Sequence, residues 1–218
     1  MLVRSLGAEA LGTLFLLVTI VGTGILGDDL SAGQPGIALL PHALFIGAML
    51  FVLITLLGPV SGAHFNPAVT LIFLLRREIS GPHALAYISV QIVFAILGVW
   101  LCHLMFDLAI LQIADTQRTG IGRWTSEIVS TFGLVFVILA GLRTSPHLIP
   151  ALVGTYIAAA LWFTASHSFA NPAVSIARMF SDTYTGIQPA DVLPYIAAQI
   201  TGAILALKVS EMLYPVET

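Results

Sequence analysis

The chain has 218 residues, of which 58% are hydrophobic and only 9% are charged, whereas soluble domains carry about 25% charged residues. So few charges cannot cover the surface of a soluble fold of this length, and the composition indicates a lipid bilayer as its surroundings. The net charge of −3, without a cluster of basic residues, argues against a nucleic-acid partner. The single cysteine excludes a disulfide framework within the chain and a cysteine-based zinc site.

Six long apolar stretches are predicted to be transmembrane helices, because a helix needs about 20 mostly apolar residues to cross a bilayer. In chain order they cover residues 2–26, 37–57, 82–106, 124–142, 148–166 and 190–214. Two shorter apolar stretches, residues 67–75 and 172–180, remain. A helix of about nine residues is roughly 14 Å long, so each of these would reach only about half way across the bilayer.

Segments of the first half of the chain recur in the second half. Residues 87–97 (YISVQIVFAIL) match residues 195–205 (YIAAQITGAIL), and each copy carries a glutamine, Gln91 or Gln199, inside an apolar span. Glu9, in the first span, has a counterpart in Glu127, in the fourth. Matched polar residues in matched spans indicate an internal repeat.

The repeat divides one domain, residues 1–218, into a first half of residues 1–110 and a second half of residues 122–218. Each half contains three spans and one half-span. Three is an odd number, so the second half must enter the membrane from the opposite side, which makes the repeat an inverted one. Lysine and arginine residues number five on the side of the termini and three on the other, which favours cytoplasmic termini.

Each short apolar stretch begins with the same tripeptide, Asn66-Pro67-Ala68 in the first half and Asn171-Pro172-Ala173 in the second. Asparagine is a favoured N-cap, and proline is tolerated at the first helical position because its missing N–H would be unpaired there. Two half-helices entering from opposite faces would meet at their N-termini near the bilayer centre, each with about half a positive charge. Facing one lumen, they would repel cations, while the asparagine amides donate to neutral solutes. Two Asn-Pro turns in loops are the alternative, which their matched positions disfavour.

Residues 61–70 (SGAHFNPAVT) resemble the first signature of the aquaporin, or major intrinsic protein, family. The resemblance covers the whole chain, including the two glutamates and two glutamines described above. It implies an all-α membrane fold, an aquaporin-like inverted repeat of six transmembrane helices plus two re-entrant half-helices, with one pore per subunit and a homotetrameric assembly. It further implies that Glu9 and Glu127 brace the loops that carry the signatures, that Gln91 and Gln199 belong to the same scaffold, and that His64 lines a vestibule.

This chain differs from the family at the constriction of the pore, which is called the filter. Family members normally have an arginine directly after the second Asn-Pro-Ala, where this chain has Val174. The family spacing places the other three filter positions at Ile46, Ala159 and Ser168. A filter of these four residues is small, mostly apolar and uncharged, and is therefore expected to be wide.

Bacterial aquaporins associated with arsenic resistance also resemble this chain in having valine after the second motif. That resemblance implies a bacterial inner (plasma) membrane location and passage of trivalent arsenic hydroxides such as arsenite and methylarsenite. Water or glycerol is the alternative solute. No cofactor is expected, and no spacing of the six histidines indicates a metal site.

Two further polar residues are candidates for the outer mouth of the pore. His42 lies one helical turn outside Ile46. Arg178 lies four residues after Val174, which leaves three roles open: a return to the filter, a vestibule charge, or an ion pair with Asp182.

Other classes of function lack support in the residues. A secondary carrier can also use inverted repeats, but it needs buried charges or unwound carbonyls for a coupling ion, and only Glu9 and Glu127 lie clearly inside spans. An ion channel would need a ring of charges or carbonyls. No nucleophile–base pair or metal triad indicates an enzyme.

Overall fold

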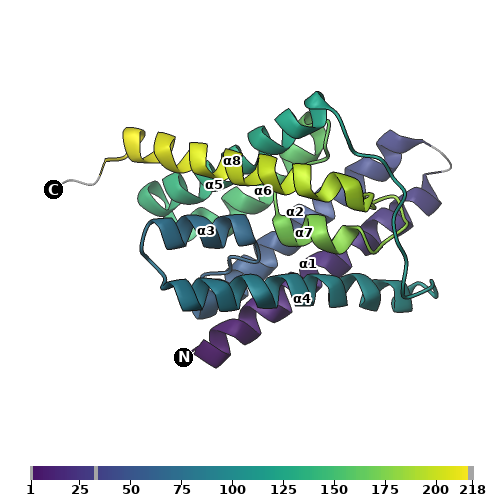
Figure 1. Ribbon diagram of the computed structural model, residues 1–218, viewed down its shortest axis with the longest axis horizontal. Helices are drawn as coiled ribbons and strands as arrows, with labels where there is room; N and C mark the ends of the chain where they lie inside the picture. The colour runs from purple at the N-terminus through teal and green to yellow at the C-terminus, as the bar shows by residue number, and fades with distance from the viewer. Residues whose placement is uncertain (1, 32–33, 216–218) are drawn as a thin grey trace.

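The computed structural model describes residues 2–31 and 34–215, and all regular structure within these ranges is helical (Figure 1). In chain order the elements are α1 (Leu2–Leu30), α2 (Pro35–Ser61), α3 (Pro67–Leu75), α4 (Gly81–Met105), α5 (Ile121–Thr144), η1 (Pro146–Leu148), α6 (Ile149–Phe163), α7 (Pro172–Arg178) and α8 (Pro189–Leu213). Six segments are long and apolar enough to cross a membrane, the fifth being η1 joined to α6. The predicted all-α fold with six spans and two half-helices is confirmed.

Most helix boundaries follow from proline and asparagine. Proline occupies the first turn of α2, α3, α4, α7 and α8, where its missing N–H costs nothing. The predicted bounds of α3 agree with the structure at both ends, whereas α7 ends at Arg178, two residues before the predicted end. The fifth span ends at Phe163 and not at residue 166, because the chain leaves the helix there to enter the second re-entrant loop.

The helices pack as two similar halves. In the first half α1 lies against α2 and α4, and in the second half α5 lies against α6 and α8. Contact between α2 and α6 joins the halves. The short helices α3 and α7 follow each other along the long axis of the molecule, between α4 and α8 (Figure 1). Helix α1 begins and α8 ends at the same end of the bundle, as an even number of spans requires (Figure 1).

Helices α2 and α6 approach so closely that their backbones touch at two glycines. A Cβ atom on Gly47 would lie 2.6 Å from the carbonyl oxygen of Gly154, and one on Gly154 would lie 2.5 Å from that of Gly47. Neither position has room for a side chain. Small residues at such crossings let membrane helices gain close packing, which drives their association in lipid.

Candidate functional site

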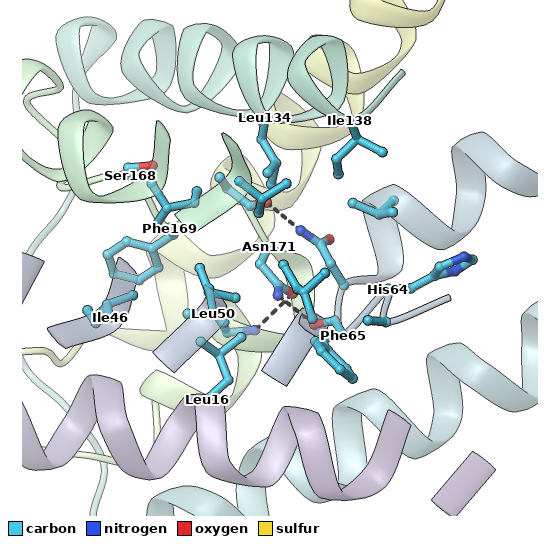
Figure 2. A pocket seen from close by; sticks show the side chains of 18 of the residues that line it. Leu16, Ile46, Leu50, His64, Phe65, Leu134, Ile138, Ser168, Phe169 and Asn171 are labelled. Carbon is cyan, nitrogen blue, oxygen red and sulfur yellow. Dashed lines mark hydrogen bonds between the residues drawn. The ribbon is translucent and has the colours of Figure 1, made fainter. Parts of the chain in front are cut away.

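A cavity of about 200 Å³ lies between the two halves of the molecule. Most of its wall is aliphatic and comes from α1, α2, α5 and α6, for example through Leu16, Leu50, Leu134 and Ile138 (Figure 2). The re-entrant loops, residues 62–66 and 167–171, supply most of the polar part of the wall. The site is thus an apolar corridor crossed by two polar loops.

Both asparagines of the repeated tripeptide line this cavity, and Figure 2 shows Asn171 among the other lining residues. Asn66 Oδ1 accepts a hydrogen bond from the Ala68 N–H at 2.9 Å, and Asn171 Oδ1 accepts one from the Ala173 N–H at 2.9 Å, so each side chain caps its own short helix. The Asn66 Nδ2 donates to the Ala170 carbonyl at 2.7 Å, and the Asn171 Nδ2 donates to the Phe65 carbonyl at 2.8 Å. Each amide therefore caps its own helix and holds the loop of the other half.

Left-handed backbone conformations shape both loops at matched positions. The residue directly before each asparagine has a positive φ, 48° at Phe65 and 48° at Ala170, and so does the residue three before it, 51° at Ala63 and 45° at Ser168. His167 adds a fifth, with a φ of 59°. Such conformations cost non-glycine residues about 1–3 kcal/mol each and persist only where the surroundings enforce them. None of these residue types signals a positive φ in the sequence.

In the first half, Glu9 enforces the loop. Its carboxylate is fully buried and accepts hydrogen bonds from the backbone N–H of His64 at 3.0 Å and of Phe65 at 2.7 Å. Ser61 Oγ and Gln91 Nε2 donate to it at 2.7 and 2.8 Å. Because all four partners are donors, the site matches an ionised, acceptor-only carboxylate.

In the second half, Glu127 is bound in the same way. It is fully buried and accepts hydrogen bonds from the Phe169 and Ala170 N–H groups, both at 2.9 Å, and from Gln199 Nε2 at 2.6 Å. Gln199 Nε2 also lies 2.9 Å from Ser175 Oγ, as Gln91 Nε2 lies 3.0 Å from Thr70 Oγ1 in the first half. The four polar residues identified in the repeat thus hold the two loops.

Three of the four predicted filter residues, Ile46, Ser168 and Val174, line the cavity. Figure 2 shows Ile46 and Ser168 together on one side of Asn171, with His64 on the opposite side. Ser168 Oγ is buried and has no hydrogen-bond partner among the described residues.

The prediction for Ala159 is wrong. Ala159 is exposed on the outer side of α6, whereas Val153, Ile157 and Leu161 line the cavity. Residues four apart share a helix face, and Ala159 lies two positions from each of its neighbours on that face, nearly opposite to it. The position in α6 was predicted by counting back from Asn171, which is correct only where the loop between them has the family's length and path.

The mouth of the cavity at the end away from the chain termini is formed by polar side chains from several segments. His42 and Arg178 both line the cavity, as does His167. The His42 Nδ1 lies 2.8 Å from Thr23 Oγ1, and its ring meets that of Tyr184 edge-on at 6.0 Å. Burial, with the charges of Arg118 and Arg178, lowers the pKa of His167 to about 4, so that this histidine is neutral at pH 7. Arg178 and Asp182 form no ion pair, since α7 ends before Asp182.

Arg118 is a component of this region that the sequence did not single out. It belongs to the long connection between α4 and α5, yet it is buried, and its guanidinium donates to the Gly186 carbonyl at 2.6 Å and the Tyr184 carbonyl at 3.1 Å. Burial of an arginine in a loop follows from tertiary packing alone. The sequence placed Arg118 only on the outer side.

Comparison with known proteins agrees with the geometry. Residues 1–168 match the family model described as Major intrinsic protein. The aquaglyceroporin AqpS of Rhizobium meliloti (strain 1021) is 50% identical over 206 residues, covering 94% of this chain and 88% of the relative. The aquaporin NIP1-1 of Zea mays is 30% identical over 212 residues, covering 93% and 72%.

A solved structure has the same fold. The X-ray structure of the aquaglyceroporin from Plasmodium falciparum superposes with a TM-score of 0.73 at 17% identity, covering 99% of this chain and 98% of the other. The same family is indicated by the family model, the relatives, the six spans and the paired Asn-Pro-Ala half-helices. The chain belongs to the major intrinsic protein family, and it is accordingly a multi-pass integral membrane protein that acts as a passive channel for small neutral solutes and not as an enzyme.

Proposed function

We propose that this chain is a wide aquaglyceroporin-type channel whose solutes include trivalent arsenic hydroxides, arsenite and its methylated form. The observation that carries the proposal is Val174. Its side chain lines the cavity directly after the second Asn-Pro-Ala, and it is small, apolar and uncharged. A guanidinium at this position would narrow the passage, and each larger solute would have to displace water from it in order to pass.

The chemistry of the wall suits a neutral solute with hydroxyl groups and an apolar side. The carbonyl oxygens of Ala63, His64, Ser168 and Phe169, in the two loops, accept no hydrogen bond from any described residue. These acceptors can replace part of the hydration of an As–OH or C–OH group. The aliphatic side chains opposite would contact a methyl group without a desolvation cost.

The paired asparagines support passage of uncharged solutes over ions. Each amide nitrogen carries two N–H donors, of which one is used across the repeat interface. The second remains for a solute oxygen. The N-termini of α3 and α7 add partial positive charge beside the two asparagines, so a cation would be repelled there.

An ion-coupled carrier finds less support. The two intramembrane carboxylates, Glu9 and Glu127, use their oxygens to hold loop backbone and glutamine, which leaves no carboxylate of these two open to a coupling ion. The described residues also contain no group of three histidine, cysteine or carboxylate side chains that could hold a metal ion.

Reconstituted proteoliposomes test the proposed solutes. Osmotic swelling with glycerol and uptake of arsenite and methylarsenite are measured for the wild type and for Val174→Arg, with Val174→Ala as the control that changes size without adding charge. We expect Val174→Arg to reduce glycerol and arsenic flux at least tenfold while water flux falls less. Equal flux of glycerol through wild type and Val174→Arg would refute the role of Val174, and absence of arsenite uptake by a glycerol-conducting wild type would restrict the channel to polyols.

We also propose a homotetramer with both termini in the cytoplasm of a bacterial inner membrane, on the basis of family resemblance and the distribution of lysine and arginine. Many large apolar side chains on the outside of the bundle, among them Phe45, Leu56 and Leu193, are exposed and available to lipid or neighbouring subunits. Mass determination of the detergent-extracted protein and protease accessibility of a C-terminal tag check the two parts separately.

A further inference from the structure

Arg178 stands at this mouth of the cavity, one helical turn beyond the constriction. It is the last residue of α7, only 4% of its surface is exposed, and it lines the cavity. Its Nε donates a hydrogen bond to the Thr185 carbonyl, and its guanidinium carbon lies 3.5 Å from the centre of the Phe169 ring. The carbonyl and the ring fix the guanidinium against the wall of the cavity.

The charge of Arg178 is not neutralised by a carboxylate. Within residues 2–31 and 34–215 the side-chain ion pair that forms is Arg76–Glu78, which belongs to another region of the molecule. The carboxylate of Asp182 accepts from the Asp115 backbone N–H, and that of Asp191 accepts from the Arg118 backbone N–H at 2.6 Å. Neither aspartate forms an ion pair with the guanidinium of Arg178.

A second buried arginine reinforces this charge. The guanidinium carbon of Arg118 lies 5.2 Å from the centre of the same Phe169 ring, so one aromatic ring is shared by two cations. Arg118 Nε and Nη2 both donate to loop carbonyls, whereas the terminal nitrogens of Arg178 donate to no described residue. The terminal nitrogens of Arg178 do not belong to the fully buried polar atoms that lack a partner. We therefore take the small exposed surface of Arg178 to face the cavity that it lines.

We propose that Arg178 is a cation-excluding residue of this channel, acting in addition to the N-termini of α3 and α7, so that the width of the passage and the charge at its mouth are set at two different levels. Val174 sets the width at the constriction, and Arg178, held back against Phe169, sets the potential at the mouth. This inference rests on the proposed channel function and is independent of whether arsenic hydroxides pass.

The separation follows from how the two interactions decay with distance. Steric narrowing acts only where a side chain projects into the passage, whereas the repulsion between two charges falls only as the inverse of their separation and is strong where water is scarce. A guanidinium fixed one turn away therefore still repels an entering cation, without occupying the space that a larger neutral solute needs.

The test compares cation leak with neutral-solute flux in the same proteoliposomes. Potassium leak under an imposed potential and glycerol swelling are measured for the wild type, Arg178→Gln and Arg178→Lys. Arg123→Gln is the matched control, because it removes one positive charge at the start of α5, near the same connection, from a side chain that does not line the cavity. Arg178→Met, which keeps the apolar stem, serves if Arg178→Gln does not insert.

We expect Arg178→Gln to raise potassium leak at least tenfold, equivalent to about 1.4 kcal/mol, while glycerol flux changes less than twofold. Arg178→Lys should retain exclusion, and Arg123→Gln should match the wild type. An unchanged potassium leak in Arg178→Gln would overturn the inference, as would an equal rise in Arg123→Gln. Loss of glycerol flux in an inserted Arg178→Gln protein would show that Arg178 only supports the fold of the mouth.

Discussion

The two buried glutamates, although equivalent in the repeat, should not be equally sensitive to substitution. Glu127→Gln and Glu9→Gln both keep the size of the side chain but replace one acceptor oxygen by an NH₂ group, which faces backbone or side-chain donors. Each substitution therefore removes one or two hydrogen bonds, depending on which of the two carboxylate oxygens is replaced. A hydrogen bond to a charged group contributes about 1.5–3 kcal/mol, so the loss is about 1.5–6 kcal/mol.

What differs is the backbone conformation that each glutamate must hold. Glu127 receives hydrogen bonds from two backbone N–H groups, from Gln199 and from the Ser166 hydroxyl, together about 6–12 kcal/mol. They act against three non-glycine residues with positive φ, His167, Ser168 and Ala170, which cost about 3–9 kcal/mol. Glu9 receives four hydrogen bonds, about 6–12 kcal/mol, against two such residues that cost about 2–6 kcal/mol. The hydrogen bonds are equal in number, so the second loop has the smaller margin because His167 adds a third strained residue where the first loop has Gly62.

We therefore expect Glu127→Gln to reduce glycerol flux per inserted channel at least tenfold and Glu9→Gln to reduce it less than threefold. Stopped-flow light scattering of proteoliposomes, normalised to the amount of folded protein on size exclusion, measures both. Glu211→Gln, at the exposed end of α8, is the control. The reasoning fails if Glu9→Gln is the more damaging change, or if Glu127→Gln conducts like the wild type.

Three further predictions concern the cavity wall, the histidine at the mouth and the helix crossing. Ile157→Ala should raise the flux of solutes larger than glycerol, whereas Ala159→Val should leave it unchanged; the reverse result would restore the family spacing. Because the pKa of His167 is lowered to about 4, the residue is neutral throughout the range above pH 5.5, and glycerol flux should be constant from pH 8 to 5.5. A flux change centred near pH 6.5 that His167→Ala abolishes would contradict this. A lowered histidine pKa also makes folding less favourable as the pH falls below 6.5. Greater stability of the protein at pH 5 than at pH 7 would therefore contradict it as well. Gly154→Val should prevent folding, judged by loss of the monodisperse peak in detergent, because its Cβ would meet the Gly47 carbonyl oxygen at 2.5 Å; normal extraction and flux would show that the crossing is not tight.

The sequence predicted the elements of this fold better than the shape of its loops. Asparagine is a favoured N-cap and proline is tolerated at the first helical position, so the pair marks the start of a helix. The bounds of α3 were accordingly predicted to the residue. The end of α7 was not, because Met179 and Phe180 are apolar but form a turn, in which Met179 packs against the core and Phe180 against Trp100. Apolarity identifies residues that avoid water, but it does not distinguish a helix from a packed turn.

The site was predicted where it depends on local chemistry and missed where it depends on the path of the chain. Ser168 and Val174 are close to an asparagine in sequence and lie at the cavity as expected. Ala159 is twelve residues away across a loop, and a shift of two residues turns a position to the opposite face of its helix. Arg118 lies in a connection 51 residues before Phe169, so no spacing rule could have placed it beside that ring.

The exchange of amide hydrogen bonds between Asn66 and Asn171 has a consequence for biosynthesis. While the ribosome is still making α5, the side chain of Asn66 has no Ala170 carbonyl to bind, and the first re-entrant loop lacks its final restraint. The lumen is therefore completed only when about three quarters of the chain has been made, and a truncated product ending before α7 would insert its helices without closing a passage. Leakage through half-made channels is thereby avoided, since neither half can form the pore wall alone.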